Sequence, residues 1–188
     1  MKIADAIIQV DDNKNNPLRV HARKITQEEF GSQYLKDVIA TMTKALKREG
    51  DGVAIAAPQI ALPLRIFVVA EESYEEDAKS KPLVFINPTI IKKSRKSAIM
   101  QEGCLSVRWV YGKTKRSLLA TVEAYDIHGN KFTYGGTGLI AHIFQHEIDH
   151  LDGILFIDHG FDFEEYTEEE IRAGEKKLEE DRLAATKK

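Results

Sequence analysis

The sequence predicts an α+β fold in which short, mostly antiparallel strands surround a buried central helix, with N-terminal and C-terminal helices packed outside. Residues 138–150 are expected to form the central helix, because they are apolar on nearly every helical face. The strands are expected from short apolar runs at 65–70 and 83–86 and from a hairpin pattern at 118–134.

Length and composition predict one globular domain. A chain of 188 residues can bury one core, and its 43% apolar and 30% charged residues are typical of a folded protein. The net charge of −3 gives no sign of a DNA or membrane partner. The single cysteine excludes an internal disulfide and fits a reducing compartment. With no signal-peptide pattern, we expect a cytoplasmic protein, with an organellar location as the alternative, that is a monomer or a weak dimer.

The N-terminal half is expected to contain one amphipathic helix followed by two strands. Thr26 and Glu29 have the spacing of a capping box, and apolar residues then recur at helical intervals as far as Gly50. The two apolar runs that follow are expected to be buried strands, and Asn87-Pro88 is expected to end the second.

The C-terminal half alternates turns with regular elements. The turn at 128–130 joins the two strands of the hairpin, and Gly135 and Gly136 are expected to break the chain before the central helix. A second capping box opens a strongly charged helix at about 167–185, which has too few large apolar residues to dock along more than a narrow stripe.

The expected central helix carries the most informative pattern, Gln-His-Glu-Ile-Asp-His at 145–150. His146 and His150 are one helical turn apart, so both imidazoles can face one metal ion. Glu147 can reach a water molecule on that ion without being a ligand itself. Buried ionisable groups are costly unless they are paired or ligated, which favours a metal site over a chance pair of core histidines.

A catalytic metal site needs a third protein ligand, and the spacing alone leaves two alternatives open. Cys104 follows Gly103, which allows close approach of the backbone, although a lone cysteine is more often a small core residue. The other alternative is a downstream glutamate, as in many zinc peptidases with an H-E-x-x-H pattern. The available glutamates occupy a charged run that a capping box explains equally well: Glu164, Glu165, Glu168, Glu169 and Glu170.

Residues 52–59, with the sequence Gly-Val-Ala-Ile-Ala-Ala-Pro-Gln, form a third notable segment. They are too rich in small residues to predict a strong helix or strand. We expect a loop whose backbone can approach a ligand. Gln59, considered alone, has the character of a surface residue.

Together, residues 52–59, 102–106 and 145–153 resemble three motifs of one family, in the same order and at similar spacing. They are similar to G-x-G-x-A-A-x-Q, E-G-C-L-S and Q-H-E-x-D-H-L-x-G of the bacterial and organellar peptide deformylases. Residues 17–19 and Arg116 are further landmarks of that family, so the resemblance covers most of the chain. The cysteine motif distinguishes this family from other H-E-x-x-H hydrolases.

The resemblance implies a single catalytic domain over 1–188 that removes the N-formyl group from the terminal methionine of new polypeptides and releases formate. It implies that Cys104, His146 and His150 hold one divalent metal ion, Fe(II) natively, with Zn, Ni or Co as substitutes. Glu147 would then be the general acid and base.

The resemblance also implies how substrate binds. The Gln59 amide and the Leu105 N–H would stabilise the oxyanion, and the peptide would add as a strand along 52–55. The residues expected to contact the peptide and its methionine are Val53, Ala54, Ile55, Gly103, Leu139, His142 and Ile143. The expected partners are N-formyl-methionyl nascent peptides. The basic run at 92–96 and the C-terminal helix are candidates for transient ribosome contact, although a solvated turn explains the run more simply.

One departure from the family pattern concerns Ala54, which replaces the second glycine of the first motif, and Ile55, which replaces the usual leucine. If position 54 needs a positive φ or close approach of substrate, a methyl group costs about 1 kcal/mol. We therefore expect catalytic efficiency below the norm of the family. Residues 107–113 also lack the common proline, so the rim beside the substrate is unusual. A zinc endopeptidase and a catalytically weak homologue that binds N-terminal peptides remain the alternative functions.

Overall fold

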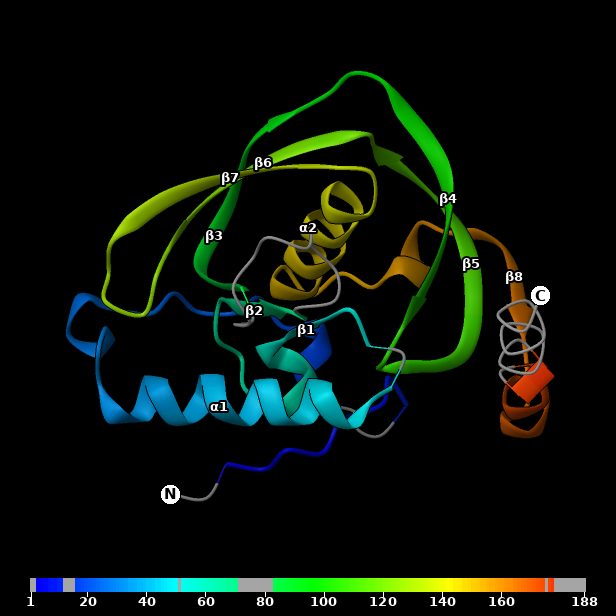
Figure 1. Cartoon of the computed structure of the whole chain (residues 1–188), viewed down its shortest axis with the longest axis horizontal. Helices are drawn as coiled ribbons and strands as arrows, with labels where there is room; N and C mark the ends of the chain where they lie inside the picture. Colours follow the sequence, from blue (N-terminus) through cyan, green and yellow to red (C-terminus); the bar gives the residue numbers. More distant parts are fainter. Residues whose placement is uncertain (1–2, 12–15, 51, 71–82, 175, 178–188) are drawn as a thin grey trace, which may run out of the picture.

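The chain has the expected α+β fold, seen in a computed structural model that describes residues 3–11, 16–50, 52–70, 83–174 and 176–177. Two antiparallel sheets curve around a central helix, and a second long helix lies outside them (Figure 1). The larger sheet has the order β1-β2-β3-β6-β7, with strands Ala54–Ala56, Ile66–Val69, Leu83–Lys93, Leu119–Tyr125 and Lys131–Thr137. The smaller sheet has the order β4-β5-β8, with strands Ser97–Cys104, Val107–Ser117 and Phe161–Glu165.

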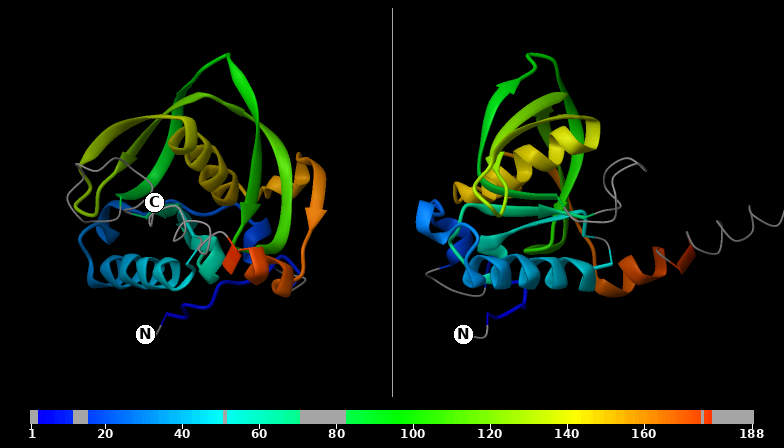
Figure 2. Two further views of the ribbon diagram at one scale, coloured as in Figure 1. Left: turned by 45° about the vertical axis from the view of Figure 1, so that its right-hand side comes forward. Right: turned by 60° about the vertical axis from the view of Figure 1, so that its left-hand side comes forward.

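Two long α-helices, a helical segment at 168–174 and several 3-10 turns complete the described fold. The outer helix α1 spans Gln33–Arg48, and the central helix α2 spans Gly138–Leu151. The 3-10 turns are η1 (Pro17–Arg19), η2 (Gln27–Glu29), η3 (Ala57–Ile60) and η5 (Phe156–Asp158). The views in Figure 2 show the larger sheet bent over α2, with α1 along the opposite face of β1 and β2.

An aromatic cluster fixes α2 against the larger sheet. The rings of Phe67 and Phe85 stack with centroids 4.5 Å apart, and the ring of Phe144 on α2 meets Phe85 edge-on at 5.2 Å. All three side chains are completely buried. Pairs with this geometry contribute about 0.5–1.5 kcal/mol each beyond the burial of their area. Because Phe144 precedes His146 by two residues, this packing also positions the helix face that carries the two histidines.

The opposite face of the sheet packs on α1. Val38 and Met42 of α1 lie in one buried cluster with Ile55 and Val68 from the sheet, whereas Ala54 belongs to the cluster around α2. This division follows from the alternation of side chains along a strand, which sends neighbouring residues to opposite faces.

The start of the first helix differs from the prediction. The capping box of Thr26 and Glu29 is present, but it closes the short turn η2 rather than α1. Gly31 then has a φ of +70°, and α1 begins after Ser32, whose hydroxyl accepts a hydrogen bond from the Leu35 N–H at 3.1 Å. The apolar periodicity was correct, but the chain turns once more before the helix starts.

Asn87-Pro88 does not end β3, contrary to the prediction. Asn87 adopts a left-handed conformation with a φ of +50°, and the register with β6 shifts between Ile86 and Thr89. Its side-chain oxygen accepts from the Ile25 N–H and its amide donates to the Ile25 carbonyl, each at 2.8 Å. A β-bulge held by a side chain therefore absorbs the proline, and the strand continues to Lys93.

Two glycine-containing segments are also more regular than predicted. Gly135 and Gly136 stay in strand β7, paired with Thr121 and Ala120, instead of breaking the chain. Within 52–59, the expected loop contains strand β1 and the turn η3. Both segments lie beside α2, and small residues let the backbone pack closely there.

The C-terminal segment is described only in part. The Glu170 carboxylate accepts from the Thr167 N–H at 2.7 Å, which confirms the second capping box, and residues 168–174 are helical. The remainder of the helix expected to about residue 185 falls almost entirely outside the described residues. Residues 94–96 form the turn between β3 and β4, as expected for the basic run. Among the described helices, none is long and apolar enough to cross a membrane.

Candidate metal centre

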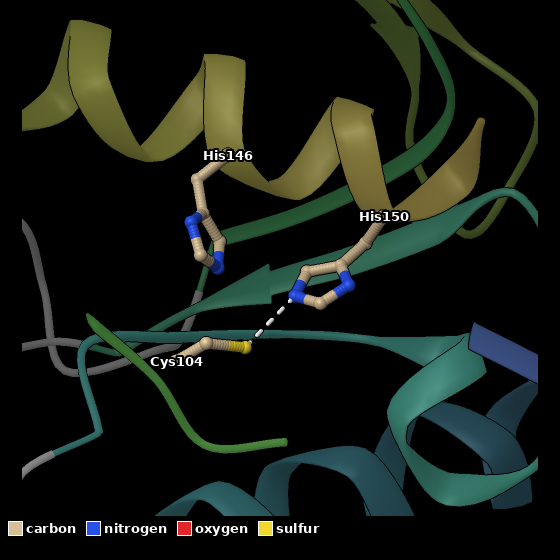
Figure 3. Close-up of side chains that lie close together, drawn as sticks. All are labelled: Cys104, His146 and His150. Atoms are coloured by element: carbon tan, nitrogen blue, oxygen red, sulfur yellow. Dashed lines mark hydrogen bonds between the residues drawn. The ribbon is translucent and has the colours of Figure 1, made fainter. Parts of the chain in front are cut away.

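Three side chains with metal-binding atoms converge between α2 and the end of β4. The Cys104 Sγ lies 3.2 Å from the His150 Nε2, and the imidazole of His146 lies one turn earlier on the helix (Figure 3). The ligand atoms of Cys104, His146 and His150 all lie within 4.8 Å of one another. No glutamate downstream of α2 joins this cluster within the described chain: the five candidates are exposed on β8 and at the start of the following helix. The third side chain is therefore the cysteine.

The carboxylate of Glu102 connects the cluster to β5 and α2. It is only 4% exposed, and its two oxygens accept hydrogen bonds from Arg116 at 2.7 and 3.0 Å and another from Thr114. It also bonds His142 Nε2 at 2.7 Å and His146 Nδ1 at 2.6 Å. The bond to Nδ1 holds a proton there and turns the His146 Nε2 toward the cluster, where the neutral ring would present a lone pair to a metal ion.

This network keeps Glu102 ionised inside the protein. Burial alone would raise the pKa of its carboxyl, but the hydrogen bonds from His142, His146 and Arg116 outweigh that effect and hold the pKa far below its usual range. The guanidinium of Arg116 also bonds the Asp149 carboxylate at 2.6 Å, so one cation joins two carboxylates. A buried charge partnered on every side is rigid, which suits a group that orients another side chain.

Glu147 differs from Glu102 because one of its carboxyl oxygens lacks a hydrogen-bond partner among the residues that the structure describes. Its Oε2 atom is buried and makes no hydrogen bond with the described residues. Burial raises the pKa of Glu147 to about 7; the nearby charge of Glu102 also raises it, while His146 opposes the shift. A carboxyl with a pKa near neutrality can accept and return a proton at physiological pH.

The residues present fit a metal ion. A thiolate and two imidazoles are a donor set used by Zn and Fe, and three protein ligands leave a coordination position for water or substrate. The two buried side-chain polar atoms that lack a partner in the described part of the chain, Glu147 Oε2 and His150 Nδ1, both belong to this site. Such atoms are rare in folded proteins, and Glu147 Oε2, which belongs to a residue lining the cavity described below, points to a site that a ligand or solvent completes.

Gln59 is held in place beside the cysteine. Contrary to its character as a surface residue, it is 1% exposed. Its side-chain oxygen accepts from the Ala56 N–H at 2.8 Å, and its amide faces Ser106 Oγ at 3.2 Å and Cys104 Sγ at 3.7 Å. The neighbouring Leu105 carbonyl accepts from Gln9 at 3.0 Å, which fixes the orientation of that peptide unit.

A cavity of about 280 Å³ opens beside the cluster between β1, β4, β5 and α2. Six of the seven residues expected to contact substrate line it: Val53, Ala54, Gly103, Leu139, His142 and Ile143. Ile55 does not, because its side chain is completely buried on the α1 face of the sheet. A loop had been expected at this point, whereas a strand alternates its side chains and sends Ile55 away from the cavity.

The sequence analysis missed the part played by Glu102, Thr114 and Arg116. Glu102 belongs to the E-G-C-L-S motif and Arg116 was noted only as a landmark. The available signal was an acidic residue two positions before the candidate ligand Cys104. The partners could not be deduced, because β5 and α2 supply them from distant parts of the sequence.

A thiolate and two imidazoles beside a buried, protonatable carboxyl define the site of a metal-dependent hydrolase. Comparisons with known proteins give the family. The family described as polypeptide deformylase matches residues 5–165. A peptide deformylase of Desulforudis audaxviator is 36% identical over 153 residues, which cover 81% of this chain and 93% of that protein. Another, from Borreliella burgdorferi, is 39% identical over 145 residues, which cover 77% and 82%.

A solved structure agrees with these matches. The Met-Ala-Ser-bound class I type b peptide deformylase of Acinetobacter baumannii matches with a TM-score of 0.73 and 28% identity, covering 84% of this chain and 100% of that chain. The chain belongs to the polypeptide deformylase family, whose members are metal-dependent hydrolases that remove the N-formyl group from nascent polypeptides.

The raised pKa of Glu147 predicts how the stability of the metal-free protein depends on pH. The fold favours the protonated carboxyl, so the contribution of Glu147 is complete below about pH 4.5 and is lost as the pH rises through about 7. This shift corresponds to about 3 kcal/mol. Urea unfolding with a chelator present should therefore show that, between pH 4.5 and 8, the free energy of unfolding of Glu147→Gln rises by about 3 kcal/mol relative to that of the wild type. Glu123→Gln, on strand β6 with a side chain 36% exposed, is the control; a constant offset for Glu147→Gln would contradict the prediction.

Proposed function

We propose that this chain hydrolyses the formyl group of N-formyl-methionyl peptides with Cys104, His146 and His150 as the ligands of one divalent metal ion. The observation that carries the proposal is the convergence of these ligand atoms within 4.8 Å beside the buried carboxyl of Glu147. When bound, the ion polarises the formyl carbonyl and lowers the pKa of water. We propose Fe(II) as the native ion, with Zn, Ni or Co able to replace it, since sulfur and nitrogen donors accept all four.

Glu147 is proposed as the general acid and base. Its carboxylate form takes a proton from the water that attacks the formyl carbon, and the resulting acid gives that proton to the departing amine. A pKa of about 7 suits both transfers, because neither form is strongly disfavoured near neutral pH. The apolar packing of α2 around this carboxyl sets that pKa.

The Gln59 amide and the Leu105 N–H are proposed to stabilise the negative charge on the formyl oxygen. The Gln59 side chain is already oriented by the Ala56 N–H, and the Leu105 N–H lies in the tight turn between the paired residues Cys104 and Val107. Donors that are fixed before the reaction need no reorganisation as charge develops, which is why such groups accelerate acyl transfer.

The substrate backbone is proposed to pair with the open edge of β1. Val53 and Ile55 direct their polar groups toward β2: the Val53 carbonyl accepts from the Ala70 N–H at 2.9 Å, and Ile55 pairs with Val68. Antiparallel strands alternate these directions, so the N–H and carbonyl of Ala54 face the cavity. The methionine side chain then enters between β1 and the first turns of α2. The Met-Ala-Ser-bound relative supports this use of the cavity.

Two substitutions test these assignments on formyl-Met-Ala-Ser with anaerobically purified protein. Glu147→Gln should keep its metal content and lose about 10²- to 10⁴-fold in formate release, because it cannot transfer the proton. Cys104→Ala should lose the metal and the activity together. The measurements are metal stoichiometry and the rate of formate release. A wild-type protein that releases no formate at any metal loading would refute the proposal and leave the weak peptide-binding homologue as the alternative.

The structure changes the expectation for Ala54. Its φ is not positive, so the argument from backbone strain is wrong. Its methyl group lies in the buried cluster around α2, perpendicular to the edge where the peptide would pair. Ala54→Gly should therefore leave kcat/KM within about threefold and lower the free energy of unfolding by about 0.5–1 kcal/mol. Peptide kinetics and urea unfolding measure both; a tenfold rise in kcat/KM would show that the methyl group obstructs the substrate.

A further inference from the structure

The rim of the cavity next to Cys104 contains an unusual bulge. Gly103 of β4 pairs with Tyr111 of β5, but the next residue, Cys104, pairs with Val107. The three residues between these partners, 108–110, therefore loop out of the ladder with β4. Bulges next to active sites commonly redirect a side chain.

Trp109, at the centre of this bulge, has a strained backbone. Its φ is +64°, a left-handed conformation that bulky residues rarely adopt. The surrounding structure maintains it, since the Trp109 carbonyl accepts from the Tyr166 N–H at 2.9 Å. Strain of this kind is concentrated at ligand sites. In this conformation the indole of Trp109 is half-buried and lines the cavity.

The adjacent Arg108 fixes the bulge without offering a free charge. Its guanidinium lies 5.3 Å from the centre of the Trp109 ring and forms an ion pair with Glu49 at the end of α1. This ion pair joins the bulge to the chain that leads into Gly52 and Val53, which line the same cavity. The group this rim offers to a ligand is thus an apolar aromatic surface.

A peptide paired with β1 would reach this surface after its first residue. If the formyl group lies at Cys104 and the methionine beside Leu139 and Ile143, a strand antiparallel to β1 continues past Val53 toward Gly52. Its second and third side chains then pass the bulge.

We propose that Trp109 is a specificity-determining residue, whose indole packs against the side chain of the second or third residue of the peptide and favours an aromatic or large aliphatic group there. This inference rests on the proposed deformylase function. Offset or edge-to-face contact between aromatic rings supplies the preference.

The test compares kcat/KM for formyl-Met-Phe-Gly, formyl-Met-Gly-Phe and formyl-Met-Gly-Gly amides. The wild type should prefer one phenylalanine peptide by about tenfold over formyl-Met-Gly-Gly. Trp109→Gly and Trp109→Asn both tolerate the left-handed backbone and should reduce that ratio to about twofold or less. Their kcat/KM on formyl-Met-Gly-Gly should stay within about threefold of the wild type, because contacts at the first residue are unchanged.

Fluorescence gives a second readout, because Trp109 is the only tryptophan in the chain. The deformylated form of the preferred phenylalanine peptide, which cannot turn over, should shift the emission of the wild-type protein, and Met-Gly-Gly should shift it less. If the ratio of kcat/KM for the phenylalanine peptides to kcat/KM for formyl-Met-Gly-Gly were equal in the wild type and both variants, the inference would be overturned and the proposed function would remain intact. Absence of formate from all three formyl peptides at any metal loading would refute the proposed function, and this inference with it.

Discussion

The buried carboxylate of Glu102 is the constraint on which the site depends. It lies between β4 and α2, where it bonds the guanidinium of Arg116 and the proposed ligand His146. An ionised group so far from solvent is stable only when its lone pairs are satisfied, so the strands and α2 must meet in one geometry. The same bonds orient His146 toward Cys104 and leave the proton on the remote ring nitrogen.

The two packed layers serve different parts of this arrangement. The aromatic cluster around Phe85 sets the position of α2, and the packing of Ile55 on α1 sets β1. The cavity lies where these elements meet the smaller sheet, so β1, which is proposed to pair with the peptide backbone, and α2, which is proposed to contact its first side chain, are positioned by different packing layers. Burial leaves the Oε2 atom of Glu147 without a hydrogen-bond partner in the described chain and raises the pKa of that carboxyl. Glu102, which bonds His146, stays ionised. Two carboxyls near one ligand therefore have distinct chemical characters.

Local patterns predicted much of this site, and long-range contacts account for what was missed. The spacing of His146 and His150 and the apolar character of α2 were sufficient to predict a histidine pair on one face of a largely buried helix. Cys104 remained one of two alternatives until the family motif was considered. The partners of Glu102 come from elements distant in sequence, which no periodicity reveals. Asn87 illustrates another limit: the preference of Asn-Pro for a turn was overridden by two hydrogen bonds to Ile25, which make the turn a bulge within a longer strand.

The most direct test of this account is the metal affinity of Glu102→Gln, measured by chelator competition with Co(II) under anaerobic conditions. Loss of the carboxylate that orients His146 should weaken binding by about 10- to 100-fold, whereas Glu147→Gln should bind within about threefold of the wild type. Because Arg116 would lose one of its two charge partners, Thr114→Val serves as a milder variant that removes one bond to Glu102 and should weaken binding severalfold. Wild-type affinity in a folded Glu102→Gln protein would contradict the central role assigned to this carboxylate.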